Sequence, residues 1–331
     1  MLLNKKNVVL SLVFLLMVFL TVVAFGSEQT NIKVGVAFVV PYPQTAGGFD
    51  RAQYKGLQVL KNEFEWEVSI AEDVPYPKQS QIIMGYLDKG YDIIIHPDNG
   101  QIDTWKELSP KYPDRWMIMM SLADELPNSP KSAAYTPDFY SYGNTLGIIM
   151  AKTSKTGTIG VTGGVPIPVL KVMFSGIIEG AKAVDPDVKV LVNYAGDWND
   201  IPKNREMTFQ LIKGGADIIF TVSGLGTKGV YECAESEGAK VIGYCYDAYE
   251  DSPNSIMTSL IMDYESIYRE MANNYTNGTL EHKIYNVGSK YFKLADFRGS
   301  ISPEVEQDVH NTIEEYKNGK LKVPYKIHDE I

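Results

Sequence analysis

Two stretches of the chain share one pattern, and this pattern decides the expected fold. Residues 86–94 read YLDKGYDII, and residues 211–219 read LIKGGADII. In each stretch the end of a helix runs into a glycine, an aspartate and an apolar strand. Such a pattern is typical of a helix followed by a buried parallel strand, and it also arises in unrelated units of this kind.

The turns that follow the two stretches favour an internal repeat. Residues 97–100 read PDNG, and residues 223–226 read SGLG. In open parallel sheets, ligands bind outside the carboxyl ends of the strands, which is where these turns are expected. Two similar lobes that face each other would enclose a cleft between them.

The rest of the chain alternates short apolar runs with longer amphipathic segments, which predicts an α/β fold. A length of 331 residues corresponds to about two domains. We expect an N-terminal lobe over residues 27–138, completed by part of 258–331, and a C-terminal lobe over residues 139–257. Residues 258–331 are expected to hold crossover and C-terminal segments.

Composition and charge exclude several classes of protein. The content of 44% hydrophobic and 22% charged residues is that of a globular protein, not of a disordered or coiled-coil chain. Lys and Arg number 31 against 41 Asp and Glu, so the net charge of −10 has the wrong sign for binding nucleic acid. The two cysteines, Cys233 and Cys245, could form at most one bridge.

Residues 1–26 have the composition of a signal peptide. Lys5 and Lys6 precede a long apolar run, and Ala24 and Gly26 are small residues of the kind that a signal peptidase requires. We expect cleavage after Gly26, and an uncleaved membrane anchor is the alternative. Because no cysteine stands directly after the run, and the first one is Cys233, we expect no lipid anchor. The expected location is the periplasm or the outer side of the plasma membrane.

The sequence lacks the common catalytic motifs. The four histidines are scattered, and no Gly-x-Ser-x-Gly, Walker A or His-Glu-x-x-His motif occurs. We therefore expect no metal, no cofactor and no enzymatic activity. Residues 224–229 read GLGTKG after an expected strand, so an NAD-type dehydrogenase is an alternative. The same glycines can bring backbone N–H groups close to any small ligand.

Further motifs occur in a fixed order along the chain. They are GFD at 48–50, KYPD at 111–114, GVTGGVPIP at 160–168, WND at 198–200, GGAD at 214–217, GYCYD at 243–247 and TS at 258–259. In this order they resemble the basic membrane protein (BMP) family of substrate-binding proteins for ABC importers, many of which bind purine nucleosides or bases. The resemblance implies a two-lobed fold like that of periplasmic binding proteins, with the ligand cleft between the lobes.

Three positions depart from the pattern of nucleoside-binding relatives. Those relatives commonly carry Asp, Asp and Lys where this chain has Ala46, Cys245 and Met262. The loss of charged groups used around a sugar argues against ribose recognition. The WND and GYCYD motifs are more similar to the branch of the family associated with free purine bases.

The candidate ligand-binding residues follow expected strands or open expected helices. They are Phe49, Asp50, Asp98, Asn99, Trp198, Asp200, Ser223 and Asp247. The two aromatic rings could stack on a flat heterocycle, and the alternative role for each is core packing. The polar side chains could bind the edge of a base or ribose hydroxyls, and their alternative roles are helix caps, turns and surface ion pairs.

These patterns predict an exported solute-binding protein that captures a purine nucleoside or nucleobase and delivers it to an ABC transporter permease. Closure of two lobes around the small molecule would bury it from both sides. We expect a monomer. An exported ligand-sensing receptor domain without a transport role is the alternative from another class.

Overall fold

The computed structural model describes residues 31–331, so the expected signal peptide at residues 1–26 lies outside the described residues. In residues 31–331, no helix has both the length and the apolar character needed to cross a membrane.

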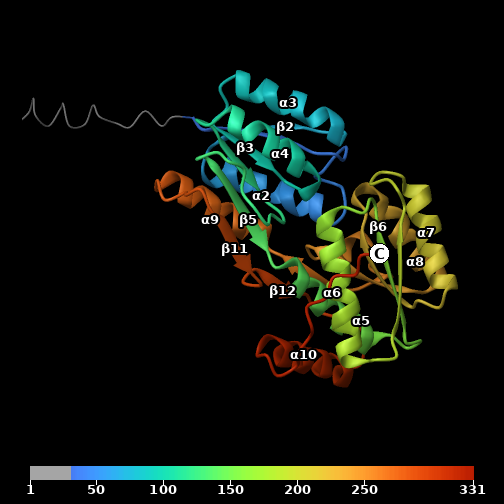
Figure 1. The fold of residues 1–331 in the computed structure, drawn as a ribbon. Coiled ribbons are helices and arrows are strands. Elements are labelled where there is room, and N and C mark those ends of the chain that lie inside the picture. Colours follow the sequence, from blue (N-terminus) through green and yellow to red (C-terminus); the bar gives the residue numbers. More distant parts are fainter. Residues whose placement is uncertain (1–30) are drawn as a thin grey trace, which may run out of the picture. The chain divides into compact units, whose positions relative to one another are not determined.

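Residues 33–331 form two six-stranded sheets, each flanked by helices (Figure 1). The first sheet consists of β1 (Lys33–Ala37), β2 (Glu67–Ala71), β3 (Ile93–His96), β4 (Trp116–Met119), β5 (Ser132–Pro137) and β11 (Ile284–Gly288). The second sheet consists of β6 (Thr158–Gly163), β7 (Lys189–Tyr194), β8 (Ile218–Val222), β9 (Lys240–Cys245), β10 (Ile256–Met262) and β12 (Phe292–Leu294). All paired strands are parallel except the edge pair β10 and β12. The predicted α/β fold is confirmed.

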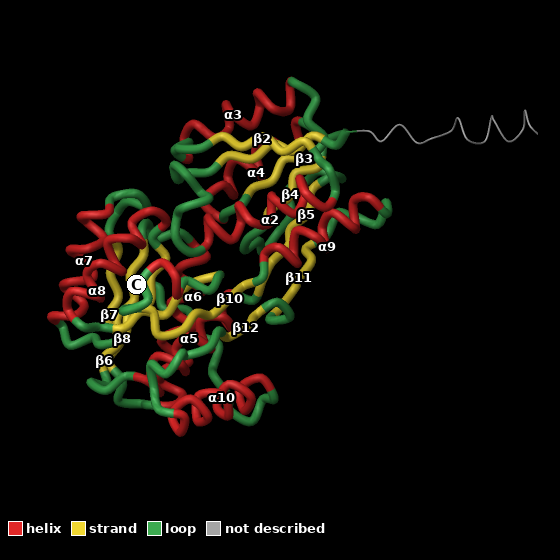
Figure 2. The backbone as a smooth tube through the Cα atoms, turned by 180° about the vertical axis from the view of Figure 1, so that it is seen from behind, coloured by secondary structure: helices red, strands yellow, loops and turns green. Residues whose placement is uncertain are grey.

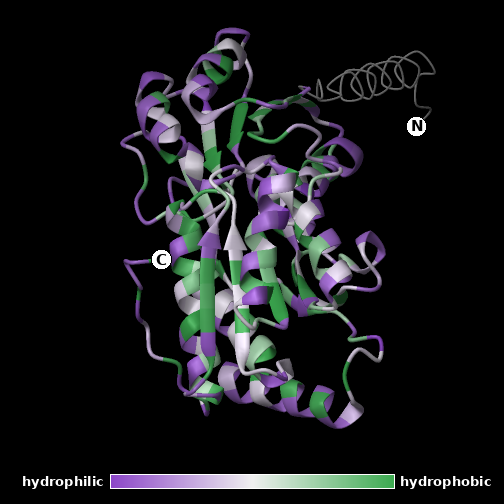
Figure 3. Ribbon diagram, turned by 90° about the vertical axis from the view of Figure 1, so that its right-hand side faces the viewer, coloured by the Kyte–Doolittle hydropathy of each residue, from purple (hydrophilic) through white to green (hydrophobic). Residues whose placement is uncertain are grey.

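Helices cover both faces of each sheet (Figure 2). Those beside the first sheet are α2 (Phe49–Glu63), α3 (Tyr76–Asp88), α4 (Ile102–Leu108) and α9 (Tyr264–Thr276). Those beside the second sheet are α5 (Phe139–Thr153), α6 (Pro168–Val184), α7 (Ile201–Lys213), α8 (Thr227–Glu237) and α10 (Pro303–Lys317). The strands between them are mostly apolar, while polar residues gather on the outer faces of the helices (Figure 3).

The two sheets have equivalent strand orders. The first runs β11-β5-β4-β3-β1-β2, and the second runs β12-β10-β9-β8-β6-β7. The two repeated sequence stretches therefore occupy corresponding places, because one joins α3 to β3 and the other joins α7 to β8. The isoleucines of β3 have no exposed surface, as expected for strands covered on both faces.

The chain passes between the sheets at three short crossovers, after β5, β10 and β11. At the first crossover, the Asp138 carboxylate caps α5 by accepting a hydrogen bond from the Ser141 amide at 2.9 Å. At the second, the Asp263 carboxylate caps α9 in the same way, through the Ser266 amide at 3.0 Å. At these two crossovers an Asp cap ends the connection and begins the next helix, while the third leads directly to β12. We propose that the lobe boundaries lie at these crossovers.

Glycines let α5 and α6 pack with their backbones in contact. A Cβ on Gly147 would lie 2.1 Å from the Ile177 carbonyl oxygen, and a Cβ on Gly180 would lie 2.2 Å from that of Asn144. A residue with a side chain would not fit at so close a helix crossing. The first turn of α6, where Val169 and Leu170 lie, also borders the candidate site.

Candidate functional site

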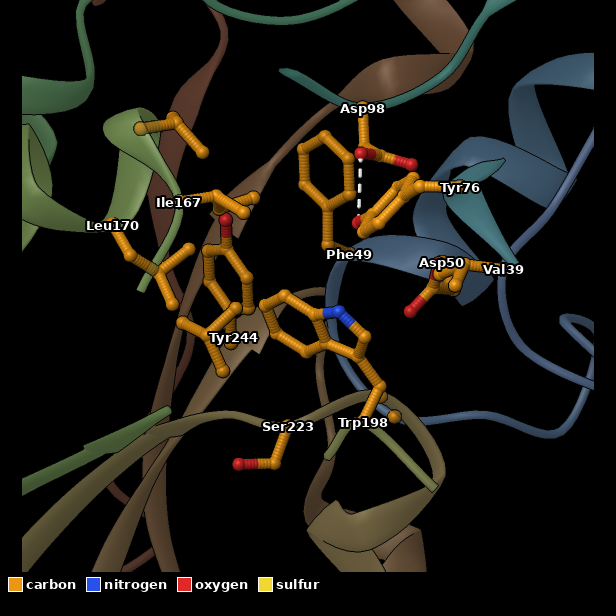
Figure 4. Close-up of a pocket in the computed structure, with 14 residues that line it drawn as sticks. Val39, Phe49, Asp50, Tyr76, Asp98, Ile167, Leu170, Trp198, Ser223 and Tyr244 are labelled. Atoms are coloured by element: carbon orange, nitrogen blue, oxygen red, sulfur yellow. Dashed lines mark hydrogen bonds between the residues drawn. The ribbon is translucent and has the colours of Figure 1, made fainter. Parts of the chain in front are cut away.

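A small cavity lies at the carboxyl ends of strands from both sheets (Figure 4). Phe49, Asp50 and Asp98 line it from the first sheet's side, while Trp198, Ser223 and Tyr244 line it from the second. The space between the two sides is narrow and partly open to solvent. A flat ligand held there would contact both sides, so we expect the two sides to separate when it enters and leaves.

The start of α2 touches the opposite side of the cavity because two glycines precede it. A Cβ on Gly47 would lie 2.6 Å from Cβ of Thr227, and a Cβ on Gly48 would lie 2.7 Å from Cδ1 of Tyr244. Gly48 also has a φ of 61°, which glycine adopts without strain. These two glycines place Phe49 and Asp50 at the cavity.

Two aromatic rings lie beside that of Phe49. Its ring is nearly parallel to that of Tyr244, with centroids 6.3 Å apart and an angle of 15° between the planes. The edge of Tyr264 meets the Phe49 ring at 5.3 Å. Such faces are apolar, flat and suited to packing against a planar ring.

Asp50 carries a carboxyl group that is surrounded by protein, although part of the residue's surface faces the cavity. Loss of contact with water and, second, the nearby charge of Asp98 together raise the pKa of Asp50 to about 8. A carboxyl group with this pKa is mostly protonated at neutral pH. It can then both donate and accept a hydrogen bond.

Asp98 is held in place by neighbouring donors. Its Oδ1 accepts hydrogen bonds from the Gly100 amide at 2.7 Å and from the Tyr76 hydroxyl at 3.1 Å. Burial raises the pKa of Asp98 to about 6, and these hydrogen bonds oppose the increase. Asp98 therefore remains largely ionised at neutral pH, while Asp50 does not.

Trp198 lies between Tyr244 and Asp50 in Figure 4 and is 9% exposed. Its ring lies against Gly164, where a Cβ would be 2.2 Å from Cε3. The indole Nε1 is buried and meets no acceptor at good hydrogen-bond geometry among the described residues, and the Tyr76 hydroxyl lies near it. Ser223 lies nearby and its hydroxyl accepts a hydrogen bond from Thr221 at 2.9 Å.

Three of the candidates do not line this cavity. Asn99 is buried, and its side-chain amide donates to the Leu122 carbonyl at 2.7 Å. Asp200 caps α7 by accepting from the Lys203 amide at 2.8 Å. Asp247 is exposed and forms an ion pair with Arg298. The structure thus brings together Phe49, Asp50, Asp98, Trp198 and Ser223.

Sequence reasoning missed several residues that line the cavity. Tyr76 follows an irregular loop, and no local pattern indicates that its hydroxyl would meet Asp98. Tyr244 lies on β9 within the GYCYD motif, so the motif could have identified it. The apolar residues Ile167 and Leu170 follow the GVTGG turn and carry no chemical signal of their own.

Among the described residues, no group of three or more His, Cys, Asp or Glu side chains could hold a metal ion. Cys233 and Cys245 are both buried and are not bridged to each other.

A family model described as an ABC transporter substrate-binding protein, PnrA-like, matches residues 33–326. The chain belongs to this family, which is called Bmp. Bmp proteins are solute-binding proteins rather than enzymes, and this membership removes the dehydrogenase alternative. They are exported, bind small molecules and work with ABC permeases. The predicted family resemblance is confirmed.

Curated relatives match the Bmp chain over most of its length. Basic membrane protein A2 of Borrelia garinii subsp. bavariensis is 26% identical over 97% of this chain and 96% of its own length. A purine-binding protein of Brucella abortus is 25% identical over 92% of this chain and 88% of its own length.

Solved structures support the fold of this Bmp protein. An ABC transporter solute-binding protein from Aeropyrum pernix K1 superposes with a TM-score of 0.76 at 18% identity, covering 90% of this chain and 95% of the other. One from Conexibacter woesei superposes with a TM-score of 0.68 at 18% identity, covering 90% and 100%. The structural neighbours confirm the predicted fold of periplasmic solute-binding proteins.

Proposed function

We propose that the protein captures a purine, preferentially the free base, between its two lobes and delivers it to an ABC importer. The observation that carries this proposal is the combination of flat aromatic faces with buried polar edge groups at one cavity. Phe49, Tyr244 and Trp198 offer the faces. Asp50 and the buried indole N–H of Trp198 offer the edge groups.

The edge groups suit a heterocycle that both donates and accepts hydrogen bonds. The indole N–H can only donate, so it needs an acceptor such as a ring nitrogen or a carbonyl oxygen. The Asp50 and Asp98 carboxyls can accept from ring or exocyclic N–H groups. A purine base presents these donors and acceptors in one plane, as the aromatic walls require.

Three positions that the family resemblance associates with a sugar support the free base over the nucleoside, and none of them lines the cavity. Ala46 and Met262 have no exposed surface, and Cys245 is 2% exposed. None of the three side chains offers a strong hydrogen-bond partner to ribose hydroxyls, and leaving such hydroxyls buried and unpaired is costly. The relative named as a purine-binding protein agrees with a purine ligand.

Calorimetric titration of the purified protein with hypoxanthine, guanine and adenine tests the proposal. Inosine and guanosine are the matched compounds that add ribose, and glucose is the control for a sugar ligand. We expect at least one base to bind about tenfold more tightly than its nucleoside, a difference of about 1.4 kcal/mol. Tighter binding of the nucleoside would contradict the preference for the base, and failure of every purine to bind would contradict the function. Mass spectrometry of ligand that co-purifies provides an independent identification.

A ligand sensor without a transport role would bind and close in the same way. Uptake of the radiolabelled base by cells with and without this protein separates the two functions. Loss of uptake in the deletion strain is expected for an importer component, and unchanged uptake would favour the sensor.

A further inference from the structure

A cluster of three side chains joins the two lobes outside the cavity. Arg51 lies on α2, beside Phe49 and Asp50. Its Nη1 donates to both carboxylate oxygens of Asp251, at 3.0 and 2.9 Å, and to the Tyr246 hydroxyl at 3.1 Å. Tyr246 and Asp251 lie in the loop between β9 and β10 of the second sheet. The cluster therefore connects chain segments that belong to different sheets.

The three side chains support one another. The Arg51 guanidinium lies over the Tyr246 ring, 4.6 Å from its centroid, and the Tyr246 hydroxyl donates to Asp251. The side chains of Arg51 and Asp251 are each 30% exposed. Because water reaches them only in part, their attraction is stronger than that of a fully exposed ion pair.

The position of this cluster sets it apart from the other ion pairs in residues 31–331. The others lie within one lobe, as Arg269 and Glu63 do, or next to a crossover, as Lys293 and Asp263 do. A backbone hydrogen bond from the Gly47 amide to the Gly224 carbonyl, at 3.1 Å, joins the lobes near the same end of α2. Arg51 is thus placed to hold the start of α2 against the second lobe.

We propose that Arg51, Tyr246 and Asp251 form an interlobe clasp that sets the affinity of the protein for its ligand without touching the ligand. None of the three lines the cavity. They are positioning residues, because they act by stabilising the arrangement in which Phe49 and Asp50 face Trp198 and Tyr244. The identity of the ligand, but not the clasp itself, rests on the proposed function.

The clasp has a thermodynamic signature that a residue in contact with the ligand lacks. Apparent affinity scales with the fraction of protein that can adopt the binding-competent arrangement. A contact that exists only when the lobes meet changes this fraction equally for every ligand. Its loss should therefore weaken all ligands by the same factor and should increase the dissociation rate more than it changes the association rate.

The test uses Arg51→Met, Asp251→Asn and the double variant of the full mature chain. Tyr246→Phe, which keeps the ring and removes only the hydroxyl, is the milder variant in case Arg51→Met lowers folding. The matched control is Arg269→Met, which breaks the Arg269–Glu63 pair, with contacts of 2.6 and 2.7 Å, inside the first lobe. Hypoxanthine and guanine are the probes, followed by stopped-flow tryptophan fluorescence.

We expect Arg51→Met and Asp251→Asn each to raise the Kd about tenfold, by the same factor for both bases. The double variant should be no weaker than either single variant, because both remove one interaction. The control should bind like the wild type. Unequal losses for the two bases, or losses that add in the double variant, would overturn the clasp.

Small-angle scattering of the ligand-free proteins keeps the test independent of the ligand. A larger radius of gyration for Arg51→Met than for wild type supports the clasp even if no purine binds, in which case only the proposed function fails. An equal radius combined with an equal loss of affinity for both bases also supports it, with the clasp forming on closure. An equal radius without any loss of affinity overturns it.

Discussion

Asp50 and Asp98 meet at one cavity but differ in protonation. Burial raises the pKa of both carboxyls, to about 8 for Asp50 and about 6 for Asp98. The difference arises because Asp98 receives hydrogen bonds from Gly100 and Tyr76, which stabilise its ionised form. At neutral pH the cavity therefore holds one neutral carboxyl and one carboxylate.

The raised pKa of Asp50 predicts how stability depends on pH. An unfolded Asp titrates near 3.8 and the folded one near 8, so between these values the folded protein holds a proton that the unfolded chain has lost. The free energy of unfolding should then fall as pH rises from about 4 to about 8, by about 1.4 kcal/mol per pH unit for this one proton. Asp50→Asn should remove this contribution while leaving that of Asp98, which ends near pH 6. Urea unfolding at pH 5 to 8 measures the difference, and parallel curves for the two proteins would contradict it.

The position of Trp198 in the cavity lining predicts that its truncation lowers ligand affinity rather than folding stability. If its indole stacks on the base, Trp198→Ala should weaken binding by about 1–3 kcal/mol, and Trp198→Phe should retain part of that. If the ring served only as core, truncation would cost about 3–5 kcal/mol of folding stability instead. Calorimetric titration and thermal melting of the same variant measure both quantities. Unchanged affinity in a folded Trp198→Ala protein would exclude the ring from the site.

The residues of the cavity were predictable where a motif marked them. Phe49, Trp198 and Ser223 occur in or beside motifs at strand ends, and the carboxyl ends of parallel strands converge. Asp200 occurs in the same kind of motif but caps a helix, because Asp suits both roles. Tyr76 could not be predicted, since its place at the cavity depends on how the loop after β2 packs.

At the scale of helices and strands, the alternation of patterns predicted most strands within a few residues. The apolar strand expected in the first repeated stretch, residues 86–94, is β3 (Ile93–His96). The strands β5, with the sequence SAAYTP, β11, with IYNVG, and β12, with FKL, were missed. β5 is built from small and polar residues that match no strand pattern, and β11 and β12 are too short to show a clear period. All three occur because neighbouring strands supply their hydrogen bonds.

The crossing of α5 and α6 predicts a large effect for a small substitution. Gly147→Ala would place a Cβ 2.1 Å from the Ile177 carbonyl oxygen, so the two helices must move apart. We expect a loss of about 2–3 kcal/mol in the free energy of unfolding. Gly85→Ala on α3 is the matched control, because a Cβ there meets nothing within 4 Å. It should stabilise the protein by about 0.5–1 kcal/mol. Urea unfolding compares the two, and equal effects would contradict the packing argument.

At the scale of the whole protein, the position of the cavity between segments of both sheets predicts that the lobes separate and close again around a ligand. The three short crossovers between the sheets are the segments where such a movement can occur. Small-angle scattering of the wild type should show a smaller radius of gyration with saturating base than without it. An unchanged radius with bound ligand would contradict closure, while the family membership would stand.

Export predicts the start of the mature chain. Cleavage after Gly26 should leave Ser27 as the first residue of a released protein. N-terminal sequencing of the protein purified from its native compartment measures this. An intact leader in the membrane fraction would contradict the prediction and favour the uncleaved anchor.

The edge strands β11 and β12 also determine when the protein can fold during synthesis. Each sheet takes its last strand from residues 284–294, although β1 to β5 are complete by residue 137. Synthesis starts at the N-terminus, so one edge of β5 stays unpaired until nearly the whole chain has been made. Unpaired edges pair readily with other chains. Aggregation thus competes with folding for most of the time that translation takes, and a chain that stops before residue 284 lacks an edge strand in both sheets.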